Sequence, residues 1–114
     1  MQIPKPSSAD MERFRSIVPD DPRIEVKPMF GNLGAFVNGN MFMGLFGSDI
    51  GVKLAPDDAA QLRAIGGRPF GPAERPMGGY VTLEPASIGT PDGQRWIARA
   101  VDHVGALPPK APRK

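Results

Sequence analysis

An Asn-Gly pair at residues 38–39 lies between two apolar segments, residues 33–37 and 40–46. A two-residue β-turn of type I′ needs positive φ at both central positions, and asparagine and glycine accept that conformation most readily. Asn-Gly flanked by apolar segments is therefore the strongest short-range signal for a β-hairpin. We expect two antiparallel strands here, joined by a two-residue turn.

The length of this turn also predicts which residues face each other. The expected cross-strand pairs are Val37–Asn40, Phe36–Met41, Ala35–Phe42 and Gly34–Met43. In this register Met41 and Met43 stand on one face of the hairpin and Phe42 on the other. A hairpin that is apolar on both faces is expected to be central in a sheet or covered on both sides.

Apolar periodicity and turn residues predict the remaining elements. Helices are expected at about residues 9–18, 56–65 and 90–105, and further strands at residues 24–30, 50–54 and 80–84. Residues 68–79 are rich in glycine and proline and are expected to form a loop, with Phe70 and Met77 as candidate anchors. This order predicts an α+β fold, a two-layer sandwich of a mostly antiparallel five-stranded sheet with helices.

The chain has 114 residues, enough for one domain but not for two. We expect a flexible leader over residues 1–8, a single domain over residues 9–107 and a disordered Pro/Lys/Arg tail over residues 108–114. The lack of cysteine excludes disulfides, zinc–thiolate sites and a thiol nucleophile. No apolar run is long enough to span a bilayer or to act as a secretory signal, so the expected location is the cytoplasm.

The formal net charge of +2 is concentrated near the chain ends. Four of the 14 basic residues lie in the expected leader and tail: Lys5, Lys110, Arg113 and Lys114. Without these four, the chain has 10 basic residues and 12 acidic ones. A DNA-binding face normally gathers its basic residues on one element. Direct binding to nucleic acid is therefore not expected.

One pattern invites a phosphate-binding interpretation and another a catalytic one, and each has a simpler structural interpretation. Gly31 and Gly34 precede a hairpin rather than a helix, and the chain has no GxxxxGK[ST] phosphate-loop pattern, so a structural role is favoured. His103 follows Asp102 directly on an expected helix, where neighbouring side chains point in different directions. A surface histidine is therefore favoured over a general base.

Metal binding also has weak support in the sequence. Four methionines near the hairpin and the loop offer soft ligands, but the chain holds a single histidine and no cysteine to complete a site. They are Met29, Met41, Met43 and Met77. Methionine more often fills a core or an adaptable binding surface. The acidic pairs at residues 20–21 and 57–58 stand where turns and helix starts favour aspartate.

Several cations are candidates for an anion site. Lys53, Arg68 and Arg75 lie in or beside the expected strand at 50–54 and the loop, and Arg95 and Arg99 share a helix face. If they converged, they would bind a phosphate or an acidic peptide. A solvated face is favoured, because exposed arginines are the norm.

The segment at residues 29–42 resembles a known family. Its sequence, Met-Phe-Gly-Asn-Leu-Gly-Ala-Phe-Val-Asn-Gly-Asn-Met-Phe, is similar to the Met-Phe-Gly, Gly, aromatic, Gly-x-Met-Phe pattern of the N-terminal domain of TfoX/Sxy-type competence regulators. Later features agree in order and spacing, namely Val52-Lys53-Leu54, Arg68-Pro69-Phe70, Met77 with Tyr80 ahead of Glu84-Pro85, and Trp96. The resemblance covers roughly residues 10 to 106.

The resemblance implies a secretion-chaperone-like two-layer fold of a kind that often dimerises. The chain resembles a stand-alone N-terminal domain. The best-known members of the family also have a C-terminal helical domain, for which no resemblance is seen in this sequence. Those members promote natural competence by helping a catabolite-activator-type transcription factor. The resemblance brings no catalytic residue set and no cofactor. It therefore implies a non-enzymatic regulatory or protein-interaction domain. It also implies a homodimer with a protein partner such as a transcription factor.

The apolar hairpin supplies the expected interaction surface. Its residues are Met29, Phe30, Met41, Phe42 and Met43. The alternative is a small-molecule or anion-binding domain, for which Lys53, Arg68 and Arg75 are the candidate anion contacts.

Overall fold

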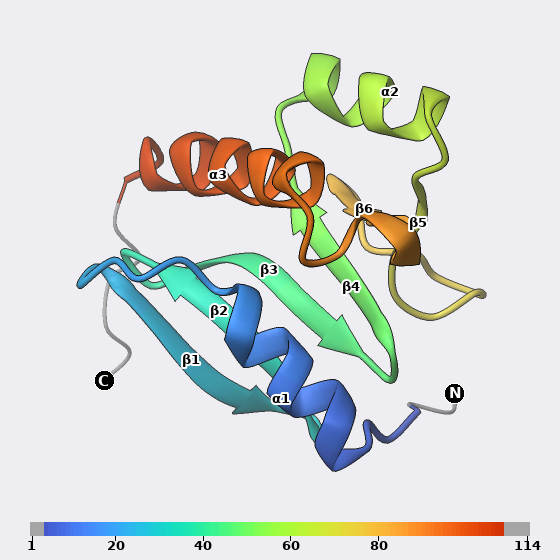
Figure 1. The fold of residues 1–114 in the computed structure, drawn as a ribbon. Helices are drawn as coiled ribbons and strands as arrows, with labels where there is room; N and C mark the ends of the chain where they lie inside the picture. The colour runs from blue at the N-terminus through green and yellow to red at the C-terminus, as the bar shows by residue number, and fades with distance from the viewer. Residues whose placement is uncertain (1–3, 109–114) are drawn as a thin grey trace.

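The structure is a computed structural model that describes residues 4–108. Within these residues the chain forms one six-stranded antiparallel sheet, three α-helices and a short 3-10 helix (Figure 1). The elements are α1 (Ser8–Ile17), β1 (Ile24–Met29), β2 (Asn32–Val37), β3 (Asn40–Phe46), β4 (Asp49–Lys53), α2 (Pro56–Ala64), β5 (Arg68–Pro69), β6 (Tyr80–Thr82), η1 (Pro85–Ser87) and α3 (Pro91–Gly105). The strand order is β1-β2-β3-β4-β6-β5. The predicted α+β class is confirmed.

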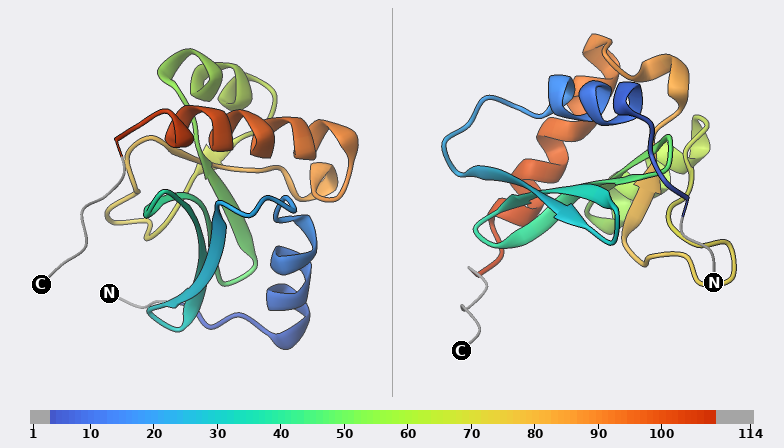
Figure 2. Two further views of the ribbon diagram at one scale, coloured as in Figure 1. Left: turned by 90° about the vertical axis from the view of Figure 1, so that its left-hand side faces the viewer. Right: turned by 90° about the horizontal axis from the view of Figure 1, so that it is seen from below.

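The helices pack on one face of the sheet. α3 carries the main apolar stripe and crosses β3 and β4, and it lies between α1 and α2 (Figures 1 and 2). Side chains from all three helices and from strands β2, β3, β4 and β6 form one buried cluster that includes Phe14, Met43 and Ile97. The core therefore lies between the helices and the sheet.

Side-chain caps mark the starts of α1 and α3, and a proline marks the start of α2. The Ser7 hydroxyl accepts a hydrogen bond from the Asp10 backbone N–H at 3.0 Å, and the Asp10 carboxylate accepts one from the Ser7 N–H at 2.9 Å. This capping box starts α1. α2 begins at Pro56 and α3 is capped by Thr90, whose hydroxyl accepts from the Gly93 N–H at 3.3 Å.

The Asn-Gly hairpin is confirmed, but its predicted register is half wrong. Asn38 and Gly39 have φ of 53° and 79°, and the first two pairs past the turn, Val37–Asn40 and Phe36–Met41, are those predicted. A β-bulge then shifts the register, so that Ala35 faces Met43 and Gly34 faces Gly44. The extra residue on β3 is Phe42. A bulge places two residues opposite one, and here it allows consecutive large side chains, Phe42 and Met43, to be buried together.

A sixth strand lies inside the segment that was predicted to be a loop. Arg68 and Pro69 form β5, which pairs with Thr82 and Val81 of β6. The Thr82 hydroxyl also donates a hydrogen bond to the Pro69 carbonyl at 2.9 Å. Two residues cannot show alternation, and proline argues against a strand in sequence, so no sequence signal marks this edge strand.

The predicted domain limits are not tested by the fold. Residues 1–3 of the expected leader and residues 109–114 of the expected tail lie outside the described residues. In the described part of the chain, no helix is both long enough and apolar enough to span a membrane.

Candidate interaction surface

Three glycines lie side by side on the sheet face opposite the core. Gly34 of β2 pairs with Gly44 of β3, and Gly44 pairs with Gly51 of β4. A Cβ at Gly34 would meet Met41, and a Cβ at Gly44 or Gly51 would meet Phe70. Three neighbouring strands therefore leave a strip without side chains, on which residues from elsewhere in the chain come to rest.

Phe70 covers one end of this strip. Its ring lies so close to Gly51 that a Cβ there would be under 3.0 Å from three ring atoms. The ring is only 2% exposed and packs between Phe46 and Tyr80, with centroid distances of 6.2 and 6.0 Å. The loop after β5 folds back on it, because the Met77 N–H donates to the Phe70 carbonyl at 2.8 Å.

Two thioethers cover the other end. The sulfur atoms of Met41 and Met29 lie 2.9 and 3.0 Å from where a Cβ of Gly34 would stand. Met29 is the last residue of β1 and Met41 the second residue of β3, so the two side chains meet over the strand between them. Both are half-buried.

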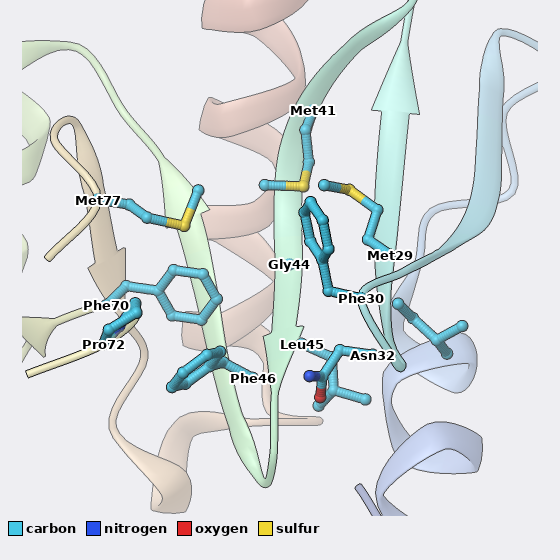
Figure 3. Close-up of a pocket in the computed structure, with 11 residues that line it drawn as sticks. Met29, Phe30, Asn32, Met41, Gly44, Leu45, Phe46, Phe70, Pro72 and Met77 are labelled. Atoms are coloured by element: carbon cyan, nitrogen blue, oxygen red, sulfur yellow. The ribbon is translucent and has the colours of Figure 1, made fainter. Parts of the chain in front are cut away.

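An apolar pocket of about 370 Å³ lies between these two covered ends. Gly44 lies at its centre, with Phe70 and Met77 on one side and Met29, Phe30 and Met41 on the other (Figure 3). It is lined by Met29, Phe30, Asn32, Leu33, Met41, Gly44, Leu45, Phe46, Phe70, Pro72 and Met77. We refer to it as the open-face pocket.

Phe30 stands at the edge of the open-face pocket in a strained and exposed position. It has φ of 50° and Gly31 has φ of 81°, so these two residues make the turn between β1 and β2. A bulky side chain in the left-handed region is an outlier, because its Cβ crowds the backbone. The side chain of Phe30 is nevertheless 81% exposed, so burial within this chain does not offset the strain.

Asn32 is a polar residue of the pocket lining, and its side chain is already bonded. The amide oxygen accepts from the Gly47 N–H at 2.8 Å, and the amide nitrogen donates to the Pro4 carbonyl at 3.1 Å. Tyr80, behind Phe70, donates its hydroxyl to the Met41 carbonyl at 2.8 Å, and burial raises the pKa of this hydroxyl to about 12. Neither side chain is free to orient a polar ligand.

Comparison with known families gives a match that covers most of this fold. The family model of the TfoX N-terminal domain matches residues 16–104, which include every strand and α3 almost to its end. The chain belongs to the TfoX N-terminal domain family. No curated protein sequence matches it, so the comparison gives the family and no individual relative.

For this TfoX N-terminal domain, the predicted interaction surface divides between the two sheet faces. Met29, Phe30 and Met41 line the open-face pocket. Phe42 and Met43 are fully buried in the core on the helix side, so their assignment to a surface was wrong. For Met43 the cause is the β-bulge, which moves its side chain to the face opposite Met41 and which the two-residue turn alone does not reveal; Phe42 was already expected on that other face, which the helices cover.

Other lining residues were missed as members of the surface. Phe70 and Met77 were predicted only as loop anchors, and Phe46 was not singled out. A signal was present in the glycines of three consecutive strands. However, the predicted register set Gly34 opposite Met43, which hid the alignment of Gly34 with Gly44.

The three predicted anion contacts have separate neighbours. Arg68 pairs with Asp49 at 3.4 Å, and the Lys53 ammonium stands 5.8 Å from the centre of the Tyr80 ring. Arg75 is exposed in the loop after β5. An anion site at these residues stays a prediction, and these contacts do not add support to it.

Several other charged residues form ion pairs at the surface. Arg23 pairs with Asp21 at 2.7 Å, and hydrogen bonds from the Arg23 side chain lower the pKa of Asp21 to about 2. Arg99 pairs with Asp58 at the start of α2, and its guanidinium lies over Trp96. Among residues 4–108, no group of three or more histidine, aspartate or glutamate side chains is arranged to hold a metal ion.

Proposed function

We propose that this chain is a non-enzymatic regulatory domain that binds another protein through its open-face pocket. The observation that carries the proposal is the pocket itself, with half-buried thioethers and the exposed Phe30 at its edge. Unbranched methionine side chains adapt their shape to a partner, and exposed apolar patches mark interaction sites. The TfoX N-terminal family suggests a regulatory, competence-type domain, which supports the same proposal.

The chemistry of the pocket favours a protein side chain over a small polar ligand. Binding sites for small molecules normally offer a few free polar groups that orient the ligand. Here the Asn32 amide is bonded to Gly47 and Pro4, and the other lining side chains are apolar. An apolar side chain from a protein partner needs no such group. The partner we propose is a transcription factor or another component of transcription, and the proposed location is the cytoplasm.

Affinity capture tests this proposal. The tagged wild-type protein is incubated with nuclease-treated lysate of its host, beside Phe30→Asn and the control Ile65→Ser, and bound proteins are identified by mass spectrometry. Phe30→Asn removes the exposed ring but keeps a residue that accepts positive φ, as Asn38 does in the next turn. Ile65 is 61% exposed at the end of α2, away from the pocket lining. We expect a transcription component with wild type and Ile65→Ser, but not with Phe30→Asn. Equal recovery on all three would contradict the proposal.

A second candidate function is the binding of a small apolar molecule. It rests on the pocket volume of about 370 Å³, which is within the range of small-ligand sites, about 300–1,000 Å³. Thermal-shift measurements with a set of uncharged aromatic compounds test it. A rise in Tm that is lost in Met77→Asp would favour this candidate, and no rise with any compound would remove it.

A further inference from the structure

The open-face pocket and the exposed ring of Phe30 lie next to each other on one face of the sheet (Figure 3). A face that carries both a projecting group and a recess can pair with its own copy, because a twofold axis satisfies both contacts at once. We propose that the open-face pocket also binds a second copy of this chain, which competes for the pocket with the transcription component proposed above. In this dimer each Phe30 ring enters the pocket of the other copy. This inference rests on the proposal that the pocket binds protein.

The pocket has room for a phenyl ring. An apolar cavity of about 150 Å³ is enough to bind benzene, and the open-face pocket measures about 370 Å³. The walls that the ring would meet are Phe70 and Met77, an aromatic ring and a thioether. Both kinds of group make favourable contacts with an aromatic ring beyond simple burial.

The charges around the pocket do not oppose a second copy. Glu25 and Lys27 of β1 pair with each other at 3.6 Å, and Asp49 pairs with Arg68 at 3.4 Å. Each ion pair is neutral in sum, so these four residues add no like-charge repulsion when two such faces meet. A protein partner with a strong net positive or negative charge would find no opposite net charge on these four residues.

The sheet edges are less suited to association than the face. β1 carries Pro28 and the charges of Glu25 and Lys27, which are the features that keep edge strands from pairing with other chains. The other edge, β5, has only two residues, one of them Pro69. We therefore place the contact between copies on the open face rather than along a strand edge.

The area available predicts a dimer of moderate strength. A buried phenylalanine contributes on the order of 150–250 Å², so the two Phe30 rings supply at most about half of the roughly 1,000 Å² that a stable interface needs. The remainder comes from lining residues that are now half-exposed, such as Met29, Met41 and Pro72. We expect the dimer to dissociate on dilution.

Sedimentation velocity over a dilution series is the first test. We expect wild type and Ile65→Ser to approach twice the monomer mass at high concentration, and Phe30→Asn and Met77→Asp each to stay monomeric. A mixture of the two pocket variants should recover part of the dimer, because the Phe30 ring of Met77→Asp still fits the intact pocket of Phe30→Asn. Association of Phe30→Asn alone at the wild-type level would overturn the inference.

Cross-linking tests the contact directly, since the natural chain has no cysteine. Phe30→Cys and Met77→Cys, mixed and oxidised, should form a disulfide between copies. A mixture of Phe30→Cys with Ile65→Cys should not. If wild type is monomeric and no cross-link forms, the inference fails. The proposed function still stands in that case if capture is lost in Phe30→Asn. Conversely, wild type could dimerise while Phe30→Asn captures the same transcription component as wild type. That result would support the dimer and contradict the regulatory proposal.

Discussion

The contact between Phe70 and Gly51 is the feature on which the open-face pocket most depends, and Gly51→Ala tests it. The φ of Gly51 does not lie in the left-handed region, so alanine brings no backbone strain. Its Cβ, however, would stand under 3.0 Å from three atoms of the Phe70 ring. Because Phe70 is 2% exposed and packed between Phe46 and Tyr80, the ring cannot move without disturbing both neighbours.

Two opposing effects set the size of the change. Overpacking a filled site costs about 1–3 kcal/mol, while replacing glycine by alanine in a strand gains about 0.5–1 kcal/mol. We therefore expect Gly51→Ala to lower the free energy of unfolding by about 1–2 kcal/mol, which for a domain of this size lowers Tm by roughly 4–8 °C. Complete loss of the Phe70 site, at about 3–5 kcal/mol, is the upper limit.

Urea unfolding followed by the fluorescence of Trp96, the single tryptophan, measures this change. Gly78→Ala is the matched control, because a Cβ at Gly78 would meet nothing within 4 Å, and its effect should stay within about 0.5 kcal/mol. In the double variant with Phe70→Leu, the smaller side chain should relieve part of the cost, giving a coupling energy of at least about 0.5 kcal/mol. Gly51→Ala as stable as wild type would refute the placement of the ring.

Three further measurements test separate features. Phe30→Asn should raise the stability of the dilute monomer by about 1 kcal/mol, because asparagine accepts the left-handed conformation better than phenylalanine, and the urea midpoint reports this. Arg23 holds the pKa of Asp21 at about 2, below its ordinary value, so the stability from this pair is present above pH 4 and is lost as the pH falls toward 2. The Tm difference between wild type and Asp21→Asn should therefore shrink as the pH falls through about 2, and a constant difference would contradict the pair. Burial raises the pKa of Tyr80, the single tyrosine, to about 12. The phenolate absorbance of Tyr80 should therefore appear near pH 12, and the stability of the fold should fall above pH 10. A titration near pH 10 would instead show that the hydroxyl is exposed.

Local signals in the sequence were enough to predict most elements of the fold. The Asn38-Gly39 turn, the proline start of α2 and the Thr90 cap of α3 each depend on residues close in the chain. Strand β5 escaped prediction because it exists only through its pairing with β6, a contact that no local pattern encodes.

The candidate site was predictable only in part, and for a related reason. Met29, Phe30 and Met41 were predicted because they flank the hairpin, and they do line the pocket. The bulge at Phe42 is a tertiary compromise that admits two consecutive large side chains to the core, so the turn alone gives the wrong register beyond Phe36. A wrong register does not show that Gly34, Gly44 and Gly51 are aligned, and it therefore gives no reason to place Phe70 and Met41 over them.

The glycine row has a consequence for how such a surface diversifies. Its floor is main chain, which changes little when side chains are exchanged, whereas its walls are a few side chains on a turn, a strand end and a loop. Substitutions at Met29, Met41 or Met77 would reshape the recess and leave the paired backbone of Gly34, Gly44 and Gly51 in place. Relatives with this floor are therefore free to change what they bind while inheriting the same fold.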